Sequence, residues 1–384
     1  MTEHLVVDAA RRLVAEHPPA STPTEEFLGA RFDAGLAWVH FPRGLGGLGV
    51  APGLQGAADA VVEAAGGPNP FDLNPMGYGM AAPTVLAHGS PALHERLLRP
   101  LYTCEEIWCQ LFSEPGAGSD LAGLATRAVR DGDGWRATGQ KVWTSKAHEA
   151  RWALLLARTD PDVPKHKGLT YFVLDMRDPG VEVRPLRQLT GDAEFNEVWL
   201  RDARLDDAWR LGDVGAGWKV AMTTLMNERT AIGGGSIERG SGSIGDALAL
   251  WRSQPDPGLR DRIVTLFARA DALRLTGMRH AAERGDGPAG PMGSLGKLVG
   301  AELNQAVYEL CVDLLGTAGT RHPGYDGDPA THDTLTWKFL RSRANTIEGG
   351  TAEVLRGILA ERVLGLPGDI RVDKDTPWRE VPRG

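Results

Sequence analysis

The sequence has few cysteines, no long apolar run and no excess of basic residues, and each absence excludes a class of protein. Its three cysteines, Cys104, Cys109 and Cys311, lack CxxC spacing, so we expect no metal site and a reducing compartment. No run of about eighteen apolar residues is present, so we expect no membrane span. The formal net charge is −8, whereas a nucleic-acid-binding protein would carry a basic stripe.

The start of the chain is not expected to be a secretory signal. Residues 1–17 combine acidic residues with helical spacing, whereas a secretory signal has a basic region followed by an apolar block. We therefore expect a cytoplasmic protein. Hydrophobic residues make up 42% and charged residues 24% of the chain, as in an ordinary globular protein. At 384 residues, the chain is long enough for two or three subdomains.

Apolar spacing divides the chain into a helical part, a strand-rich part and a second helical part. Helices are predicted near residues 5–14, 54–65 and 91–101, with a glycine-rich loop at 41–49. Strands are predicted from about residue 107 to 205, and the ones with the strongest patterns span 152–157, 169–174, 181–184 and 197–200. Helical spacing returns at Trp218 and continues to about Val363, and an irregular tail follows.

The segment SEPGAGSD, residues 113–120, is the first of two motifs that suggest chemistry. Gly116 and Gly118 can adopt positive φ and let backbone N–H groups approach a ligand closely. Ser113 and Ser119 add hydroxyls that can donate to carbonyl or phosphate oxygens. A glycine-rich turn is by itself most often only a turn.

The second motif, KVWTS, follows about two dozen residues later at residues 141–145. A polar hairpin, RDGDGW, precedes it, and the residues after the hairpin alternate as in a strand. Trp143, Thr144 and Ser145 therefore lie at a strand end, where we expect them to face the same region as the first turn. The alternative is a core aromatic at Trp143 and an ordinary strand-end hydroxyl at Ser145.

Together these motifs resemble the acyl-CoA dehydrogenase family of flavoenzymes, in which both occur in this order. Segments 195–205, 215–229 and 341–367 extend the resemblance. It implies an α+β fold with an N-terminal helical domain, a central β-barrel and a C-terminal four-helix bundle. The corresponding domains are residues 1–105, 106–210 and 211–366, with a tail at 367–384.

The resemblance also implies FAD as cofactor and α,β-dehydrogenation of an acyl-CoA to the trans-2-enoyl-CoA. A carboxylate removes the α-proton while the β-hydrogen leaves as hydride to flavin N5. The thioester oxygen must be held by preorganised donors, and the carboxylate must be partly desolvated.

Two positions are candidates for the base. Many members of the family carry it immediately before a Gly-Thr pair near the C-terminus, where this sequence has Gly349. A second branch carries it before an arginine on the first bundle helix, where this sequence has Glu228 and Arg229. Thr224, Leu225 and Ile232 place Glu228 on a largely apolar helix face, and we favour it. The alternatives are a structural ion pair at Glu228, or Glu348, one residue out of register, as base.

Other roles follow position by position from the resemblance. Gly349 supplies an N–H to the thioester carbonyl, Ser113 binds the flavin edge, and Ser119 lies near the pyrophosphate and CoA. Trp143 packs on the isoalloxazine, and Ser145 replaces a family threonine near N5. The complete FAD set is Gln110, Phe112, Ser113, Gly118, Ser119, Trp143, Thr144, Ser145, Thr351 and Glu353, of which the last two contact the far half of FAD. The substrate set is Ser119, Asn227, Arg229 and Gly350, with Arg229 steadying the loop or the acyl region.

The sequence departs from the family pattern where neighbouring subunits contact FAD. Residues 248–262 contain two prolines and lack the usual Arg-x-x-Phe-Gly segment, and Asp313 stands where a glutamine is common. We expect a homodimer or homotetramer, with a hetero-oligomer as the alternative. Electron-transfer flavoprotein is the expected acceptor.

Three alternatives for the function remain. The protein could be a same-fold enzyme that acts on an acyl group bound to a carrier protein, a same-fold enzyme that uses oxygen as the electron acceptor, or a non-catalytic subunit of a hetero-oligomeric acyl-CoA dehydrogenase. Gly233, Gly234 and Gly235, just past the proposed base, favour a branched or bulky acyl group.

Overall fold

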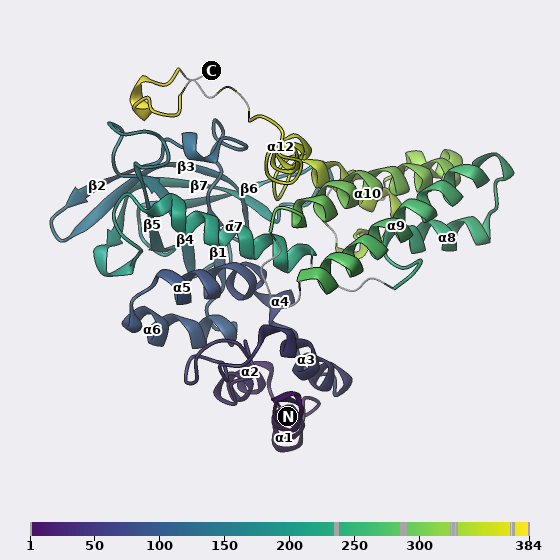
Figure 1. Ribbon diagram of the computed structural model, residues 1–384, viewed down its shortest axis with the longest axis horizontal. Helices are drawn as coiled ribbons and strands as arrows, with labels where there is room; N and C mark the ends of the chain where they lie inside the picture. Colours follow the sequence, from purple (N-terminus) through teal and green to yellow (C-terminus); the bar gives the residue numbers. More distant parts are fainter. Residues whose placement is uncertain are drawn as a thin grey trace. The chain divides into compact units, whose positions relative to one another are not determined.

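Helices come first along the chain, a mixed sheet follows and helices close it, in the order that the sequence predicts (Figure 1). The computed structural model describes residues 2–233, 238–284, 290–322, 324, 327, 329–368, 370 and 373–382; the side chains of residues 2, 228–233 and 284 are outside this description. Two compact units form. The first contains Met1–Pro185, Phe195–Asn227 and Arg371–Gly384, and the second contains Leu186–Glu194 and Glu228–Ile370.

The first unit begins with short helices around an aromatic core. Val6, Ala10 and Leu13 recur at helical spacing and are all buried, which explains the first helix. Trp38 stacks on Phe41, with ring centroids 4.7 Å apart. The predicted helices near 54–65 and 91–101 are confirmed. The helices are α1 (Thr2–Glu16), α2 (Thr24–Asp33), α3 (Gln55–Ala64), α4 (Pro70–Leu73), α5 (Ala82–His88) and α6 (Pro91–Tyr102), with a π-helical turn at Gly77–Ala81.

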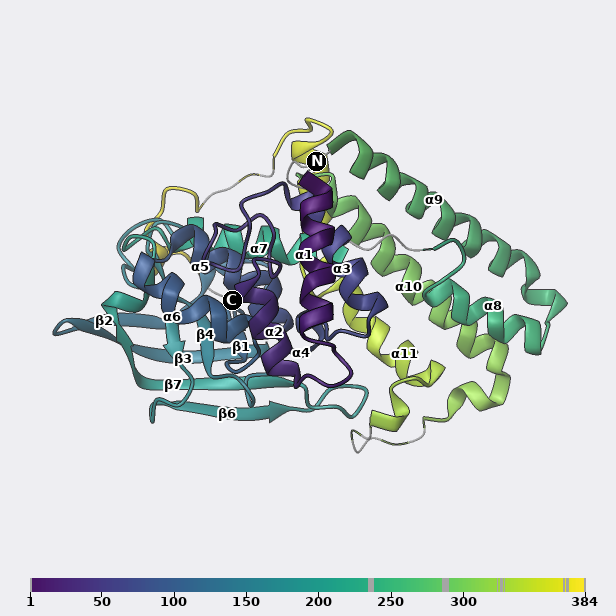
Figure 2. The same cartoon turned by 90° about the horizontal axis from the view of Figure 1, so that it is seen from below.

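Eight strands form the sheet of this unit, in the order β6-β7-β3-β2-β4-β5-β8, with β1 parallel to β4. The predicted hairpin is confirmed, because Asp131 pairs with Gly134 across a two-residue turn. All seven residues of β4 are buried. In both Figure 1 and Figure 2, α5 and α6 lie on one side of the sheet. The strands are β1 (Trp108–Leu111), β2 (Arg127–Asp131), β3 (Gly134–Ser145), β4 (Trp152–Arg158), β5 (Leu169–Asp175), β6 (Val181–Leu186), β7 (Phe195–Asp206) and β8 (Arg210–Leu211).

Asn74 joins the helices to the sheet. This fully buried side chain donates to the carbonyls of Leu101 and Glu106, at 3.0 and 3.2 Å, and accepts from the N–H of Trp108 at 3.1 Å. A buried amide with its bonds satisfied specifies one geometry. It thereby sets where β1 begins, and β1 leads into the first motif.

The second unit is built around α10, whose buried residues include Val307, Leu310 and Cys311. α8 and α9 contribute Ile244 and Ile263 to the same core. Its helices are α8 (Ser243–Ser253), α9 (Arg260–Arg284), α10 (Gly293–Leu315), α11 (Leu335–Ser342) and α12 (Ala352–Arg362), whereas α7 (Gly217–Gly233) spans the division between the units. The fold class is confirmed; residues 105, 210 and 366 stay proposed domain boundaries.

The segment between β6 and β7 belongs to this second unit. Asp192 is buried, and its carboxylate accepts from His332 Nε2 at 2.9 Å and from the Trp337 indole at 2.7 Å. Residues 186–194, which the sequence places in the strand-rich part, therefore belong to the second unit, and no local pattern indicates this.

Candidate active site

The structure brings the two sequence motifs together within the first unit. The N–H of Val142, in β3, donates to the carbonyl of Ser113 at 2.9 Å. The turn is closed by a pair of backbone hydrogen bonds between Glu114 and Ala117, at 3.0 and 3.1 Å. The serine-glycine turn and the Trp-Thr-Ser strand end thus share one local framework.

A buried ion pair underlies this framework. Lys141 is fully buried, and its ammonium lies 2.9 Å from both the carbonyl oxygen of Phe112 and Oε1 of Glu114. The Glu114 carboxylate also accepts from the N–H groups of Ala125 and Thr126, at 2.7 and 2.9 Å. Satisfied buried charges of this kind hold the surrounding backbone in one arrangement.

Opposing effects act on the titration of this pair. Burial opposes ionisation of Glu114, but the Lys141 charge and the N–H donors outweigh it and lower the pKa of the carboxyl below 4.5. Burial lowers the pKa of Lys141, and Glu114 offsets part of that effect. Sequence analysis missed both residues as site determinants, although a lysine in the alternating segment before Trp143 was a visible signal.

Trp143 lies on a β-bulge and is no core aromatic. The register between β3 and β7 shifts between Lys141 and Thr144, and Trp143 has a φ of +61°. Its side chain is 59% exposed and touches Phe195 edge-on, with ring centroids 6.0 Å apart. Bulges re-aim side chains, and left-handed backbone at a bulky residue is costly, so both features are typical of functional positions.

Two predicted site residues, like several other residues in the described part of the chain, have a buried polar atom without a hydrogen-bond partner. These atoms are Oε1 of Gln110, on β1, and the hydroxyl of Thr144, a residue only 1% exposed. Both atoms have almost no accessible surface, so they do not by themselves mark a ligand site. A flat cofactor with polar ring edges fits the exposed indole of Trp143 and the half-buried serines Ser113 and Ser145.

The remaining predicted residues of this unit have mixed exposure. Phe112 is buried, and Ser113 and Ser145 are half-buried. Gly118 and Ser119 are exposed, and Asp120 beside them pairs with Lys165 at 2.9 Å.

α7 packs its first half against the first unit. Thr224 is fully buried, and its hydroxyl lies 2.9 Å from that of Thr84 and 2.8 Å from that of Tyr171. Asn227 is half-buried, and its amide donates back to the carbonyl of Thr223 at 2.9 Å. Glu228 follows one turn after Thr224. The side chains of Glu228 and Arg229 lie outside the described residues, as do Gly234 and Gly235.

The second unit holds the predicted thioester loop. Gly349 and Gly350 have φ values of +60° and +96°, a run of backbone that only glycine adopts easily. The ammonium of Lys297, on α10, donates to the carbonyls of Asn345 and Gly350, both at 2.7 Å. Lys297 was not predicted from the sequence, because nothing local links it to a loop some fifty residues later.

Glu348 is engaged in structural contacts. Its two carboxylate oxygens accept from the Arg341 guanidinium at 3.1 and 2.9 Å, and Asn345 donates to Oε1 at 2.8 Å. A bidentate arginine pair of this kind is strong and directional. Thus Glu348 supports the shape of the loop.

Thr351 and Glu353 begin α12. The Thr351 hydroxyl accepts from the N–H of Val354 at 3.2 Å as the helix N-cap, and Glu353 is exposed in the first turn. Asp313, where the family often has glutamine, forms an ion pair with Arg262.

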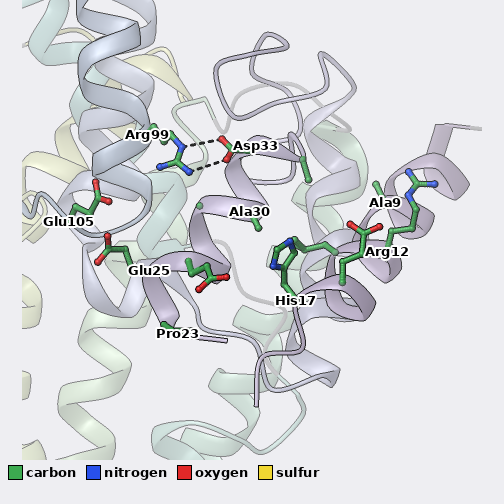
Figure 3. Close-up of a pocket in the computed structure, with 14 residues that line it drawn as sticks. Ala9, Arg12, His17, Pro23, Glu25, Ala30, Asp33, Arg99 and Glu105 are labelled. Atoms are coloured by element: carbon green, nitrogen blue, oxygen red, sulfur yellow. Dashed lines mark hydrogen bonds and ion pairs between the residues drawn. The ribbon is translucent and has the colours of Figure 1, made fainter. Parts of the chain in front are cut away.

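An open groove of about 850 Å³ lies between α1, α2 and α6 (Figure 3). Charged side chains line it, and the Asp33 carboxylate accepts two bonds from Arg99, at 3.0 and 2.9 Å. None of the predicted site residues lines this groove, so its size does not identify the site.

Within the described residues, no group of three or more His, Cys, Asp and Glu could hold a metal ion. The three cysteines are free. None of the described helices is both long and apolar enough to cross a membrane.

Two family models match the chain. The one described as "Acyl-CoA dehydrogenase, middle domain" matches residues 109–203, and the one described as "Acyl-CoA dehydrogenase, C-terminal domain" matches residues 215–364. The two ranges contain every predicted site residue.

Curated relatives agree with this result. FadE34 of Mycobacterium tuberculosis, named an acyl-CoA dehydrogenase, is 42% identical over 355 residues, which are 91% of this chain and 47% of the relative. The chain therefore spans about half of the length of that relative. IpdE1 of Mycobacterium tuberculosis, also named an acyl-CoA dehydrogenase, is 38% identical over 88% of this chain and 86% of its own length.

Solved structures share the fold. The Tcur3481-Tcur3483 steroid ACAD superimposes with a TM-score of 0.72 at 26% identity, covering 95% of this chain and 97% of the other. The ChsE4-ChsE5 complex from Mycobacterium tuberculosis gives a TM-score of 0.71 at 26% identity, covering 96% and 97%.

Proposed function

The chain belongs to the acyl-CoA dehydrogenase family of FAD-dependent oxidoreductases, and from that premise we propose that it converts an acyl-CoA thioester to the trans-2-enoyl-CoA. Bound FAD supplies the acceptor for the β-hydride. The observation that carries the proposal is the joining of the two motifs: the Val142 N–H donates to the Ser113 carbonyl, and Trp143 next to it is exposed on a bulge.

In this proposal Glu228 takes the α-proton. Glu228 follows the fully buried Thr224 by one helical turn, and this spacing supports the choice of Glu228. Glu348 is a poor alternative, because Arg341 and Asn345 occupy its oxygens. Arg229 steadies the acyl region.

The loop at Gly349 has the second role. Its N–H donates to the thioester carbonyl and stabilises the negative charge that develops there as the α-proton leaves. Asn227 and Gly350 complete the substrate contacts. Lys297 and Arg341 hold the loop, which supports a preorganised donor.

The FAD contacts follow the same logic. Gln110, Ser113, Thr144 and Ser145 hydrogen-bond the flavin ring, against which Trp143 packs. Phe112 shapes the ring pocket. Gly118 and Ser119 meet the pyrophosphate, and Ser119 also meets CoA. Thr351 and Glu353 contact the far half of FAD.

For the substrate we propose a bulky acyl group, such as a steroid-derived one. Two features support this choice: the run Gly233, Gly234 and Gly235 after the proposed base, and the likeness to a protein named a steroid ACAD.

The partners are proposals too. Electron-transfer flavoprotein is the proposed acceptor, and a homodimer or homotetramer is the proposed assembly. The likeness to a two-protein complex, ChsE4-ChsE5, supports the hetero-oligomer as a second possibility. A cytoplasmic location stays a prediction.

The decisive experiment combines flavin content with reduction kinetics. Purified protein is expected to be yellow and to release FAD on acid precipitation. Glu228→Gln should keep FAD but slow flavin reduction by acyl-CoA about 10²–10⁴-fold, the scale of a lost general base, whereas Glu348→Gln should be milder. Protein that cannot bind FAD would refute the function. Near-normal reduction in Glu228→Gln with none in Glu348→Gln would refute the base assignment.

A further inference from the structure

The last described segment of the chain returns to the first unit. Residues 373–382, which we call the C-terminal strap, lie along the loop at 159–168 that joins β4 to β5. The N–H of Trp378 donates to the carbonyl of Val163 at 2.9 Å, and that of Arg379 donates to the carbonyl of Pro161 at 3.1 Å. Pro377 forms a β-bridge with Pro164. The irregular tail is therefore a docked segment.

The indole of Trp378 connects the strap to the residues that follow the glycine-rich turn. Its Nε1 donates to the carbonyl of Gly123 at 3.1 Å. The guanidinium of Arg158 lies 4.1 Å from the centre of the same ring. Arg158 also donates to the carbonyls of Ala122 and Leu124, at 2.6 and 3.1 Å. The ring and the guanidinium together hold the backbone of residues 122–124.

Lys165 makes a second connection, at the turn itself. Its ammonium lies 2.6 Å from Asp373 of the strap and 2.9 Å from Asp120, the residue after Ser119. The lysine side chain is only 14% exposed. The two carboxylates outweigh the effect of burial and raise the pKa of Lys165, so it is a cation at neutral pH.

The turn needs such connections. Gly116 and Gly118 are exposed, and no atom lies within 4 Å of where a Cβ would be at either residue. Exposed glycines carry high conformational entropy, and of residues 116–119 only Ala117 is buried in the core. The ion pair of Glu114 and Lys141 anchors its start, and Asp120 anchors its end.

We propose that the C-terminal strap positions the Gly118-Ser119-Asp120 turn for the phosphates of its ligands, with Asp373 and Trp378 as positioning residues. The inference rests on the proposed function, in which Ser119 faces the FAD pyrophosphate and CoA. The strap touches no reacting group. It acts through Lys165 and through the backbone of residues 122–124.

The test compares the wild type with a chain that ends at Ile370 and with Asp373→Asn. Asp375→Asn is the matched control, because it makes the same change in charge two residues along at an exposed side chain. Trp378→Phe keeps an aromatic ring for Arg158 and removes the Nε1 donor together with part of the indole. Hydrogen exchange of residues 115–125 is measured on the FAD-free and the FAD-bound protein, together with the Kd for FAD and kcat and KM for acyl-CoA.

Truncation and Asp373→Asn are expected to speed exchange in residues 115–125 and to raise the Kd or KM about fivefold, with kcat within about twofold of the wild type. Trp378→Phe should act in the same direction with a smaller effect. Asp373→Glu should restore the wild-type values, and Asp375→Asn should match them.

Unchanged exchange in every strap variant would overturn the proposal, whatever the flavin content. Faster exchange with an unchanged Kd for FAD and an unchanged KM for acyl-CoA would overturn the proposed effect of the strap on ligand binding. It would also overturn the placement of Ser119 at the phosphates. A protein that never binds FAD refutes the proposed function alone, since exchange in the FAD-free protein still tests the connection.

Discussion

At the scale of single residues, Trp143 shows how a strand can present an aromatic ring outside the core. Trp135, Ala137 and Lys141 are buried at alternate positions of β3, and the bulge shifts this pattern by one residue. Val142 and Thr144 are therefore buried, and Trp143 is exposed. Holding a bulky residue at positive φ costs about 1–3 kcal/mol, which the surrounding sheet must offset. Such a cost without a packing gain is expected where the ring serves a ligand.

Replacing Trp143 by alanine therefore tests ligand binding separately from stability. Trp143→Ala is expected to change the free energy of unfolding of FAD-free protein by less than about 1 kcal/mol and to weaken FAD binding about tenfold. Trp135 is the matched control: it is 6% exposed, and its indole donates to Asp207 at 2.7 Å. Trp135→Ala should cost about 3–5 kcal/mol. Urea unfolding and FAD titration provide both measurements, and equal losses of stability would contradict this assignment of Trp143.

The ion pair of Lys141 and Glu114 predicts a large stability effect. Lys141→Met leaves the Glu114 carboxylate without its countercharge and is expected to cost about 3–5 kcal/mol of unfolding free energy. The exposed pair of Arg136 and Asp131 provides a control, and Arg136→Met should cost less than about 1 kcal/mol. Equal losses of unfolding free energy in Lys141→Met and Arg136→Met, measured by urea unfolding, would rule out a structural role for the buried pair.

The same pair predicts a pH dependence. The pKa of Glu114 is lower in the folded protein than its ordinary value of 4.5, so its ionisation stabilises the fold above pH 4.5. That contribution is lost as the pH falls through the lower folded value. Glu114→Gln is expected to flatten the fall in unfolding free energy below about pH 4.5. Urea unfolding at several pH values measures the slope, and identical slopes would show that Glu114 does not contribute.

At the scale of elements, α10 supports the loop that carries Gly349. Lys297 donates to this loop, and the Gln305 amide donates to the carbonyls of Ser342 and Arg343, at 3.2 and 3.3 Å. One face of a long, buried helix therefore sets the path of the segment between α11 and α12. A rigid scaffold of this kind is what a preorganised N–H donor requires.

Substitution of Gly349 tests the loop. Gly349→Ala places a Cβ at a φ of +60° and is expected to cost about 1–2 kcal/mol of stability and at least about tenfold in kcat. Lys297→Met should lower kcat in the same direction. Gly357→Ala, at an exposed site in α12 with open space around it, should be neutral or stabilising. Stopped-flow reduction and urea unfolding measure these effects, and unchanged kcat in Gly349→Ala would remove the loop from the mechanism.

At the scale of the whole molecule, the proposed FAD contacts are divided between two compact units. Ser113 and Trp143 belong to the first, and Thr351 and Glu353 belong to the second. Chains of this kind often unfold in more than one step. Excess FAD is expected to stabilise the folded protein by about 2.7 kcal/mol in total for one bound FAD at 100 times the Kd. Scanning calorimetry with and without FAD checks this, and thermal transitions that FAD leaves unchanged would contradict the prediction.

Much of this organisation can be predicted from the sequence, because it depends on local patterns. The period of apolar residues predicts the strand at 152–157 and the helix at 91–101, which the structure has at 152–158 and 91–102. The two glycines and two serines at 113–119 identify the turn. The likeness of Trp143 and Ser145 to a family motif locates the flavin region. The Asp131–Gly134 hairpin was likewise predictable, since its turn chemistry is encoded in adjacent residues.

What the sequence alone determined is the succession of elements, the family and the motif residues, since each depends on neighbours along the chain. Tertiary structure decided the rest. It alone buried Lys141 against Glu114, exposed Trp143 on a bulge, left Thr144 without a partner and returned the strap to Lys165. These features depend on contacts between residues far apart in the chain. Burial and charge pairing are properties of the packed fold, so the local sequence pattern does not predict them.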